Sequence, residues 1–328
     1  MSATSRTLVQ AVRDGLAGEL ARDEDVVVLG EDVGENGGVF RATEGLLDEF
    51  GPDRVIDTPL AESAIVGASV GMAAYGLRPV PEIQFSGFLY PGFDQLVSHA
   101  ARLRTRSRGS VTVPLTLRAP YGGGIRAPEH HSESKEAFYA HEPGLTVVIP
   151  STPHDAKGLL ASAIRSPDPV VFLEPKRIYR AFREDVPDEP YTVPVGEAAV
   201  RREGGDVSVV TYGAMTRPTL DAATVLAEDG VDAEVIDLRT LSPLDRETLV
   251  DSFRKTGRGV VVHEAPKTLG VGAEVVATLQ EAALPYQEAP IERVTGYDVP
   301  VPLYDLENFY LPNALRVREA VERVVDYR

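Results

Sequence analysis

Glu62 is a carboxylate whose position in the sequence is compatible with binding a ligand. It follows the apolar run Val55–Ile56 in the segment VIDTPLAES, where Pro59 ends the extended chain. A carboxylate in the first turn of the next helix would meet the positive end of the helix dipole. Ligands of open α/β sheets also bind beyond the carboxyl ends of the strands. A helix-start role and a ligand-binding role are therefore both open for Glu62.

Two adjacent histidines, His130 and His131, lie in the polar segment APEHHSESKEAFYAHEPG. Imidazole titrates near neutral pH and can act as an acid or a base, but a surface or capping position would also accept it. None of the six histidines forms H-E-x-x-H or another i, i+4 zinc pair. We therefore expect no metal site built by this chain alone.

The serine in GASVG, Ser69, fits the G-x-S-x-G pattern of a hydrolase nucleophile elbow. That elbow requires the serine on a sharp turn directly between a strand and a helix. Ser69 instead lies inside ESAIVGASVGMAAYG, whose small residues are typical of a tightly packed buried helix. The sequence therefore favours a structural serine.

Two other glycine patterns give weak signals. Gly270 and Gly272 resemble the start of a dinucleotide fingerprint, but Val275 stands where its third glycine should be. A helix-start turn is the better interpretation. The run 122–124 has no following Lys-Ser or Lys-Thr, so it predicts a mobile surface or active-site segment rather than a phosphate cradle.

The composition excludes several classes of function. Lys and Arg total 33 against 50 Asp and Glu, so the formal charge of −17 repels nucleic acid and anionic membranes. Few of the basic residues are lysines, which resembles the usage of a salt-adapted proteome. The absence of cysteine excludes disulfides, thiolate metal sites and a cysteine nucleophile, so any covalent carrier must come from a partner. Without a signal-like or membrane-spanning apolar run, a cytoplasmic location is expected.

The elements that must position these residues follow an alternating pattern. Apolar runs typical of buried strands recur between longer amphipathic segments, which predicts mostly parallel sheets covered on both faces. The length of 328 residues predicts two domains, and the proline-rich, charged stretch 175–194 is the linker candidate. The expected fold is α/β with two doubly wound domains, at 1–180 and 201–328, joined by a linker at 181–200. Strands are expected at 26–29, 55–56, 79–83, 113–117, 146–149, 170–173, 207–211, 233–236, 259–263 and 291–295, and helices in the second half at 219–228, 246–255, 273–283 and 313–325.

Several long segments together resemble one known family. They are VIDTPLAESAIVGASVGMAAYGLRPVPEIQF, FDQLVSHAARLR, LRAPYGGGIRAPEHHSESKEAFYAHEPGLTVVIPSTPHDAKGLL and SPDPVVFLEPKRIYR in the first half, and EVIDLRTLSPLD, KTGRGVVVHEAP, APIERVTGYDVPVP and NFYLP in the second. The chain is similar to the β subunit of the thiamine-diphosphate-dependent first component of 2-oxo acid dehydrogenase complexes. This resemblance implies a pyrimidine-binding domain followed by a transketolase C-terminal-like domain.

The resemblance also implies cofactors and partners. Thiamine diphosphate would be shared with an α subunit in an α2β2 heterotetramer, and the α subunit would hold the diphosphate and its magnesium. Consistent with this, we find no G-D-G followed by a downstream asparagine in this chain. The β chain alone should then be inactive. The lipoyl group to be acylated would belong to an acyltransferase core, and the C-terminal domain would help to bind that core.

Site residues carry over from the resemblance by position. Glu62 corresponds to the glutamate that hydrogen-bonds the aminopyrimidine ring and so promotes loss of the thiazolium proton. Leu60, Gln84 and Phe88 should line the pyrimidine pocket, Phe88 without the hydroxyl of the tyrosine found in relatives. His131 matches the histidine near the substrate and the arriving lipoyl group, with His130 the weaker candidate. Relatives also hold potassium through backbone oxygens at the positions of Val113, Leu115, Thr116, Ala163, Ser166 and Asp168.

Substrate and alternatives stay open. The segments FLEPKRIYRAFRE and HSESKEAF favour branched-chain 2-oxo acids, whereas pyruvate-specific enzymes share most of these motifs. A split transketolase or deoxyxylulose-phosphate synthase-like subunit would share the pyrimidine-domain glutamate. A third possibility is a non-catalytic module that only docks the acyltransferase core.

Overall fold

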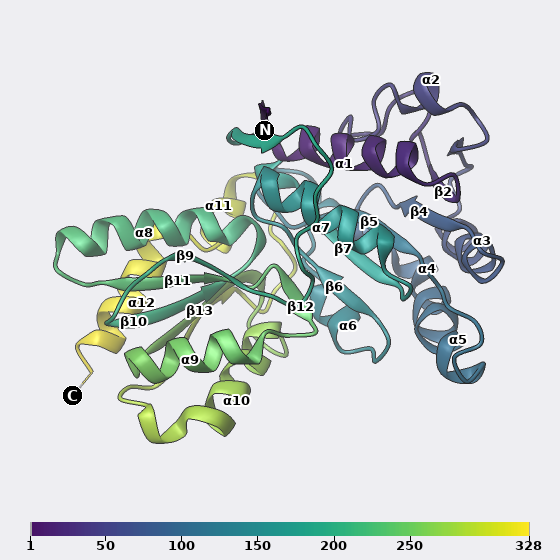
Figure 1. Cartoon of the computed structure of the whole chain (residues 1–328). Helices are drawn as coiled ribbons and strands as arrows, with labels where there is room; N and C mark the ends of the chain where they lie inside the picture. Colours follow the sequence, from purple (N-terminus) through teal and green to yellow (C-terminus); the bar gives the residue numbers. More distant parts are fainter. Residues whose placement is uncertain (1, 328) are drawn as a thin grey trace. The chain divides into compact units, whose positions relative to one another are not determined.

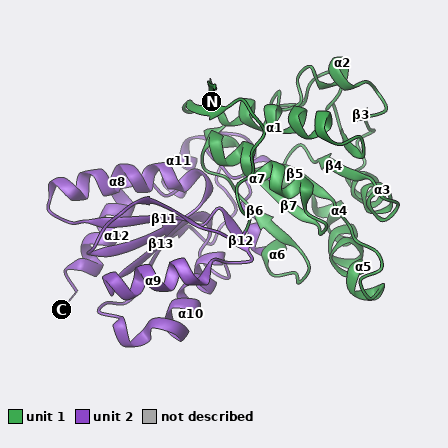
Figure 2. Cartoon of the chain, viewed as in Figure 1, with its two compact units in different colours: residues 1–121, 138–195 green, residues 122–137, 196–328 purple. Residues whose placement is uncertain are grey.

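The computed structural model describes residues 2–327 and divides the chain into two compact units (Figures 1 and 2). Unit 1 contains the chain up to Tyr121 together with Phe138–Val195. Unit 2 contains Gly122–Ala137 together with the chain from Gly196 onward. The segment that carries both candidate histidines is therefore part of unit 2, although the flanking sequence on either side belongs to unit 1.

Unit 1 contains a parallel sheet whose strands are continuous apolar runs. Strands β2, β5 and β7 are buried along their whole length, as expected for a sheet covered on both faces. Their carboxyl ends share one edge, because Gly30 of β2 pairs with Asp57 of β3 and Glu82 of β4. In spatial order the strands are β6 (Thr146–Val148), β7 (Val170–Pro175), β5 (Thr116–Tyr121), β4 (Arg78–Glu82), β2 (Val26–Gly30) and β3 (Val55–Asp57).

Helices cover both faces of this sheet (Figure 1). On one face α1 (Leu8–Arg22) packs against α7 (Pro153–Arg165), and Gly15 permits the close approach, since a Cβ there would lie 3.3 Å from Leu160 Cδ2. On the other face lie α3 (Glu62–Ala74), α4 (Tyr90–Asp94), the π-helical turn η2 (Gln95–Ala100) and α5 (Ala101–Arg106). Shorter elements of unit 1 are α2 (Leu46–Phe50), η1 (Ser86–Phe88) and η4 (Lys176–Ile178). The short helix η3 (Glu129–His131) belongs to unit 2, and α6 (Glu136–Ala140) begins in the unit 2 segment and ends in unit 1.

Unit 2 contains a mixed sheet with β9 (Ala199–Arg202) antiparallel at one edge. The remaining order is β11 (Ala233–Asp237), β10 (Val207–Thr211), β13 (Gly259–Pro266) and β14 (Glu292–Gly296), all parallel. Helices α8 (Thr216–Glu228) and α12 (Ala314–Val325) lie on one face, and α9 (Arg246–Thr256) and α10 (Val271–Ala283) on the other (Figure 1). Shorter elements are η5 (Gly213–Met215), β12 (Thr240–Ser242), η6 (Leu284–Tyr286), η7 (Tyr304–Leu306) and α11 (Glu307–Tyr310).

The predicted α/β class and the paired doubly wound sheets are confirmed. Several strands differ from the prediction, and β9 and β12 were not predicted at all. Strand β5 begins at Thr116 rather than at 113. The stretch 175–194, predicted to be the linker, contains β8 (Glu184–Pro187), which pairs antiparallel with β1 (Ala3–Arg6). Among the residues of these two four-residue strands only Val186 is buried, so the ribbon leaves no apolar run in the sequence.

The weak glycine and serine motifs have structural explanations. Ser69 is buried inside α3, and its hydroxyl donates to the carbonyl of Ile65 at 2.8 Å. Gly270 caps α10. A Cβ on Gly270 would lie 2.7 Å from His263 Cε1, and one on Gly272 would lie 2.7 Å from His263 Nε2. The helix interpretation of Ser69 and the helix-start interpretation of Gly270 are therefore confirmed.

Candidate functional site

Polar side chains gather where the central strands of unit 1 end. Glu31 and Asp32 directly follow β2, Glu62 begins α3 shortly after β3, and Gln84 follows β4. Because the carboxyl ends of parallel strands share one edge, this is where an open α/β sheet places its ligands. The structure therefore places Glu62 and Gln84 at the same edge of the sheet.

Glu62 is the first residue of α3 and remains partly exposed. No side chain caps this helix end, since the preceding residue is Ala61. No capping side chain therefore competes with the Glu62 carboxylate for the positive end of the helix dipole. Gly92 of α4 lies against this turn, since a Cβ there would come within 3.2 Å of the Glu62 carbonyl oxygen and 2.9 Å of Val66 Cγ2. The lack of a side chain at Gly92 allows α4 to pack directly on the turn that presents Glu62.

Three carboxylates meet at this position. Burial, and then the nearby charges of Asp32 and Glu62, raise the pKa of Glu31. Asp32 adopts a positive φ of 60°, which aspartate tolerates better than most residues. Its carboxylate accepts a hydrogen bond from Gln84 Nε2 at 3.3 Å. The sequence reasoning missed Glu31 and Asp32, although their position directly after a buried strand was a usable signal.

The apolar candidates flank these groups. Leu60 is 70% exposed, an unusual position for a leucine beside a helix start. Phe88 is half-buried in η1, and its ring packs edge-on against Phe85 with the ring centres 5.4 Å apart. An uncovered leucine and a partly exposed aromatic ring next to carboxylates suit a planar heteroaromatic ligand with ring nitrogens.

The candidate histidines are described as part of unit 2. His131 ends the short helix η3 and is half-buried, while the side chain of His130 is 62% exposed and lies 3.2 Å from Glu129 Oε1. His131 belongs to unit 2, whereas Glu62 belongs to unit 1. Of the two histidines, His131 has the more enclosed position.

Comparison with known proteins assigns the family. The model of the family "Transketolase, pyrimidine binding domain" matches residues 4–181, and "Transketolase, C-terminal domain" matches residues 196–317. The pyruvate dehydrogenase E1 component subunit beta of Bacillus subtilis (strain 168) is 53% identical over 321 residues, 98% of this chain and 99% of that protein. The chain belongs to the β-subunit family of 2-oxo acid dehydrogenase first components.

Other relatives agree with this assignment. The pyruvate dehydrogenase E1 component subunit beta of Staphylococcus aureus (strain Mu50 / ATCC 700699) is also 53% identical, over 98% of this chain and 99% of that protein. A solved structure titled "Split gene transketolase, inactive beta4 tetramer" superposes with a TM-score of 0.76 and 24% identity, covering 98% of both chains. At that identity the similarity concerns the fold. It agrees with the fold that the two family models assign to the chain.

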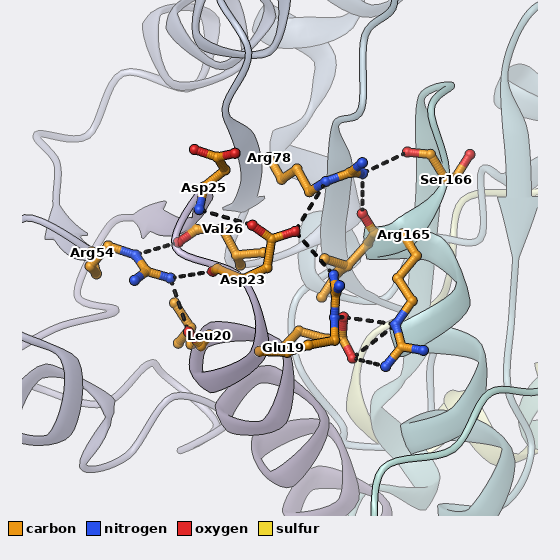
Figure 3. A network of polar contacts seen from close by, with 11 residues as sticks. Glu19, Leu20, Asp23, Asp25, Val26, Arg54, Arg78, Arg165 and Ser166 are labelled. Carbon is orange, nitrogen blue, oxygen red and sulfur yellow. Dashed lines mark hydrogen bonds and ion pairs between the residues drawn. The ribbon is translucent and has the colours of Figure 1, made fainter.

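The predicted potassium residues lie in two adjacent segments of the β subunit. Val113 and Leu115 precede Thr116, the first residue of β5. Ala163 lies in the last turn of α7, and Ser166 and Asp168 lie between α7 and β7. The segments meet where Val170 N donates to Leu115 O at 2.8 Å. Neutral carbonyl oxygens suit potassium, but the guanidinium of Arg78 already donates to Ser166 O at 3.3 Å (Figure 3). Potassium binding by these carbonyl groups stays a prediction.

No group of histidines, aspartates and glutamates within residues 2–327 could hold a metal ion. Over the same residues, none of the helices combines the length and apolar character that a bilayer crossing requires.

A second titratable cluster lies in unit 2. Glu136 is fully buried, and the Tyr212 hydroxyl donates to its Oε1 at 2.7 Å. Its Oε2 has no hydrogen-bond partner among residues 2–327. Burial raises the pKa of Glu136 to about 7, against the lowering effect of the Tyr212 hydrogen bond. The Tyr212 ring in turn stacks on buried His263, whose pKa burial lowers to about 4.

Glu136 should make the stability of the β subunit depend on pH. An unfolded glutamate ionises near pH 4.5, whereas folded Glu136 keeps its proton until about pH 7. Its stabilising contribution is therefore complete below pH 4.5 and is lost as the pH rises to 7, at about 1.4 kcal/mol per unit and about 3 kcal/mol in all. Urea unfolding of the full chain from pH 4.5 to 8 should show this decline, and Glu136→Gln should remove it. Parallel pH curves for the two proteins would contradict the assignment.

Proposed function

We propose that this chain supplies the aminopyrimidine half of a thiamine diphosphate site shared with an α subunit, whose residues hold the diphosphate and magnesium. The α/β pair decarboxylates a small 2-oxo acid and passes the acyl group to the lipoyl arm of an acyltransferase core. The observation that carries this proposal is Glu62, partly exposed at the start of α3 on the ligand-binding edge of the pyrimidine-domain sheet. Bound there, the cofactor supplies an acidic carbon and an electron sink for decarboxylation.

The side chains at this edge suit that cofactor half. Glu62 provides a carboxyl oxygen that can share a proton with a ring nitrogen. Two further carboxyl groups, Glu31 and Asp32, lie at the same edge, and burial followed by the nearby charges raises the pKa of Glu31. Leu60 and Phe88 offer apolar surface, and Gln84 is oriented by Asp32. Closure of the site by a partner would exclude water and strengthen each of these interactions.

The two domains divide the work in this proposal. Residues 1–180 form the pyrimidine-binding domain, 181–200 connect, and 201–328 form the transketolase C-terminal-like domain that contacts other subunits and the core. We take pyruvate as the first substrate to test, because the relatives reported above are named for it. A branched-chain acid remains the alternative from the FLEPKRIYRAFRE and HSESKEAF segments.

Reconstitution tests the function directly. The chain is purified with its α subunit and supplied with thiamine diphosphate, magnesium, a lipoyl domain and either pyruvate or 2-oxoisovalerate. Substrate-dependent lipoyl acylation supports the proposal, and the preferred acid settles the substrate. Turnover of ketose phosphates without lipoyl acylation would instead indicate a split transketolase or deoxyxylulose-phosphate synthase. Core binding without any turnover would indicate an assembly module.

His131→Ala should separate the two half-reactions. In this proposal His131 donates a proton as the lipoyl dithiolane opens, a contribution of about 10²- to 10⁴-fold for a positioned acid. Lipoyl acylation by the reconstituted pair should fall by that order, while decarboxylation measured with an artificial electron acceptor falls far less. His130→Ala is the matched control and should leave both assays close to wild type. Equal loss of the two activities in His131→Ala would refute this division.

A further inference from the structure

Two buried carboxylates of unit 2 bind the backbone of the glycine segment 122–126. Glu264 Oε2 accepts a hydrogen bond from Gly123 N at 2.8 Å. Glu307 accepts two, from Gly124 N at 2.7 Å on Oε1 and from Arg126 N at 2.9 Å on Oε2. Both glutamates are only 2% exposed. Three amides that could have cradled a phosphate are thus already bound to the chain's own carboxylates.

The glycine residues of this segment allow the two carboxylates to come close to its backbone. Gly122 has a φ of +84°, and a Cβ there would lie 2.6 Å from Glu264 Oε1. A Cβ on Gly123 would lie 3.1 Å from Glu307 Oε1, and Gly124 has a φ of +93°. Side chains at these positions would displace the carboxylates or strain the backbone. The run of three glycines, unexplained by any phosphate motif, is explained by these two contacts.

The same segment is tied to His131 through the backbone. Gly122 N donates to Glu133 O at 3.0 Å, which closes the loop on the far side of the histidine. Within the loop, His131 N donates to Pro128 O at 2.9 Å, and Ser132 Oγ donates to Ala127 O at 3.2 Å. The amides that bind the carboxylates therefore lie near one end of the loop that carries His131, and the hydrogen bond from Gly122 N to Glu133 O joins the two ends of that loop.

Hydrogen bonds inside a protein are electrostatically stronger than in water, because the surrounding medium has low polarity. Glu307 bridges two amides that lie two residues apart, so it fixes the local turn as well as its position. On the same turn the Arg126 guanidinium lies over the Tyr304 ring, 5.3 Å from its centre. The two glutamates that bind the loop are themselves held in place by burial.

We propose that Glu307, assisted by Glu264, is a positioning residue for lipoyl acylation. The two carboxylates hold Gly122–Arg126 so that His131 is presented in one orientation, although neither glutamate touches the substrate. This inference rests on the proposed function of His131. It predicts that loss of Glu307 affects the half-reaction that uses the histidine and spares the one that uses Glu62.

Glu307→Gln tests this role with little change in the shape of the side chain. Its amide has one acceptor oxygen, so either Gly124 N or Arg126 N would face a donor. Lipoyl acylation by the reconstituted α/β pair should fall about 10- to 100-fold, the range for misplacing a reacting group, with reduction of an artificial acceptor within about twofold. Glu264→Gln, which can still accept from Gly123 N, should lose less. Glu319→Gln, an exposed position on α12, is the matched control.

Hydrogen–deuterium exchange of the full chain supplies a second readout that does not depend on activity. Glu307→Gln should speed exchange in peptides covering 122–137 and leave those covering β10 and β13 unchanged. Gly124→Ala, which strains the same turn from the backbone side, should reproduce both effects. If Glu307→Gln matches Glu319→Gln in acylation and exchange, or if both half-reactions fall together with faster exchange throughout unit 2, the positioning role is wrong. The wild-type α/β pair could show no lipoyl acylation while Glu307→Gln still speeds exchange in peptides covering 122–137. That result would overturn the proposed function and retain the contact between Glu307 and the loop.

Discussion

Replacing Glu62 by glutamine is expected to lower decarboxylation by the reconstituted α/β pair about 10²- to 10⁴-fold. Glutamine keeps the size of the side chain and its position at the start of α3, but its amide cannot share a proton with a ring nitrogen as a carboxyl group does. The loss should appear with an artificial electron acceptor as well as with lipoyl domains, because activation of the cofactor precedes both. A pre-steady-state assay should place the defect before carbon dioxide release.

Glu35→Gln is the matched control for Glu62→Gln. Glu35 is an exposed carboxylate on the loop after β2, and its backbone amide, not its side chain, binds Asp57 at 3.0 Å. Its replacement removes the same charge near the same edge and should leave turnover near wild type. Assembly with the α subunit, checked by light scattering, must be intact in both variants. Undiminished decarboxylation in a correctly assembled Glu62→Gln complex would end the catalytic assignment.

The sequence predicted those parts of the fold that leave a repeating signal. Strands β2, β7 and β10 are buried on both faces and therefore appear as continuous apolar runs. Ribbon strands β1 and β8 leave no such signal, and edge strand β9 pairs antiparallel with β11 through an irregular register. Short, half-exposed strands are selected by their neighbours rather than by their own pattern.

The candidate site divides in the same way. The resemblance predicted Glu62 and Gln84 by position, and the structure places both at one edge of the sheet. The carboxylates on the glycine segment could not be found from spacing, since Glu264 and Glu307 lie more than a hundred residues from the amides that they bind. Their discovery needs the tertiary fold, because a hydrogen bond to a backbone amide carries no side-chain signature.

Beneath the Glu62 edge, unit 1 contains a fully buried ionic network. Arg118 of β5 donates to both oxygens of Glu174, at 2.6 and 3.0 Å, and to Glu82 Oε2 at 2.8 Å. The Tyr179 hydroxyl donates to Glu174 Oε2 at 2.6 Å. Burial raises the pKa of Glu82, against the lowering influence of Arg118. Since Glu82 ends β4 two residues before Gln84, the network also fixes the strand end that presents the site.

Arg118→Met should therefore destabilise the chain by about 3–5 kcal/mol, the usual cost of removing one partner from a buried ion pair. Methionine fills much of the space but leaves Glu82 and Glu174 without their shared cation. Arg102→Met, which breaks a half-exposed pair with Glu142, should cost less than about 1 kcal/mol. Urea unfolding of the full chain measures both.

Neutralising the carboxylates should restore part of the loss. The triple variant Arg118→Met with Glu82→Gln and Glu174→Gln removes the uncompensated charges, and buried ion networks replaced as a whole often cost little. Its free energy of unfolding should lie between those of Arg118→Met and the wild type. If Arg118→Met costs no more than Arg102→Met, or if the triple variant is less stable than Arg118→Met, unpaired carboxylates are not the source of the destabilisation. Because Glu82 and Gln84 share one strand end, Arg118→Met should also weaken cofactor binding under conditions where the chain remains folded.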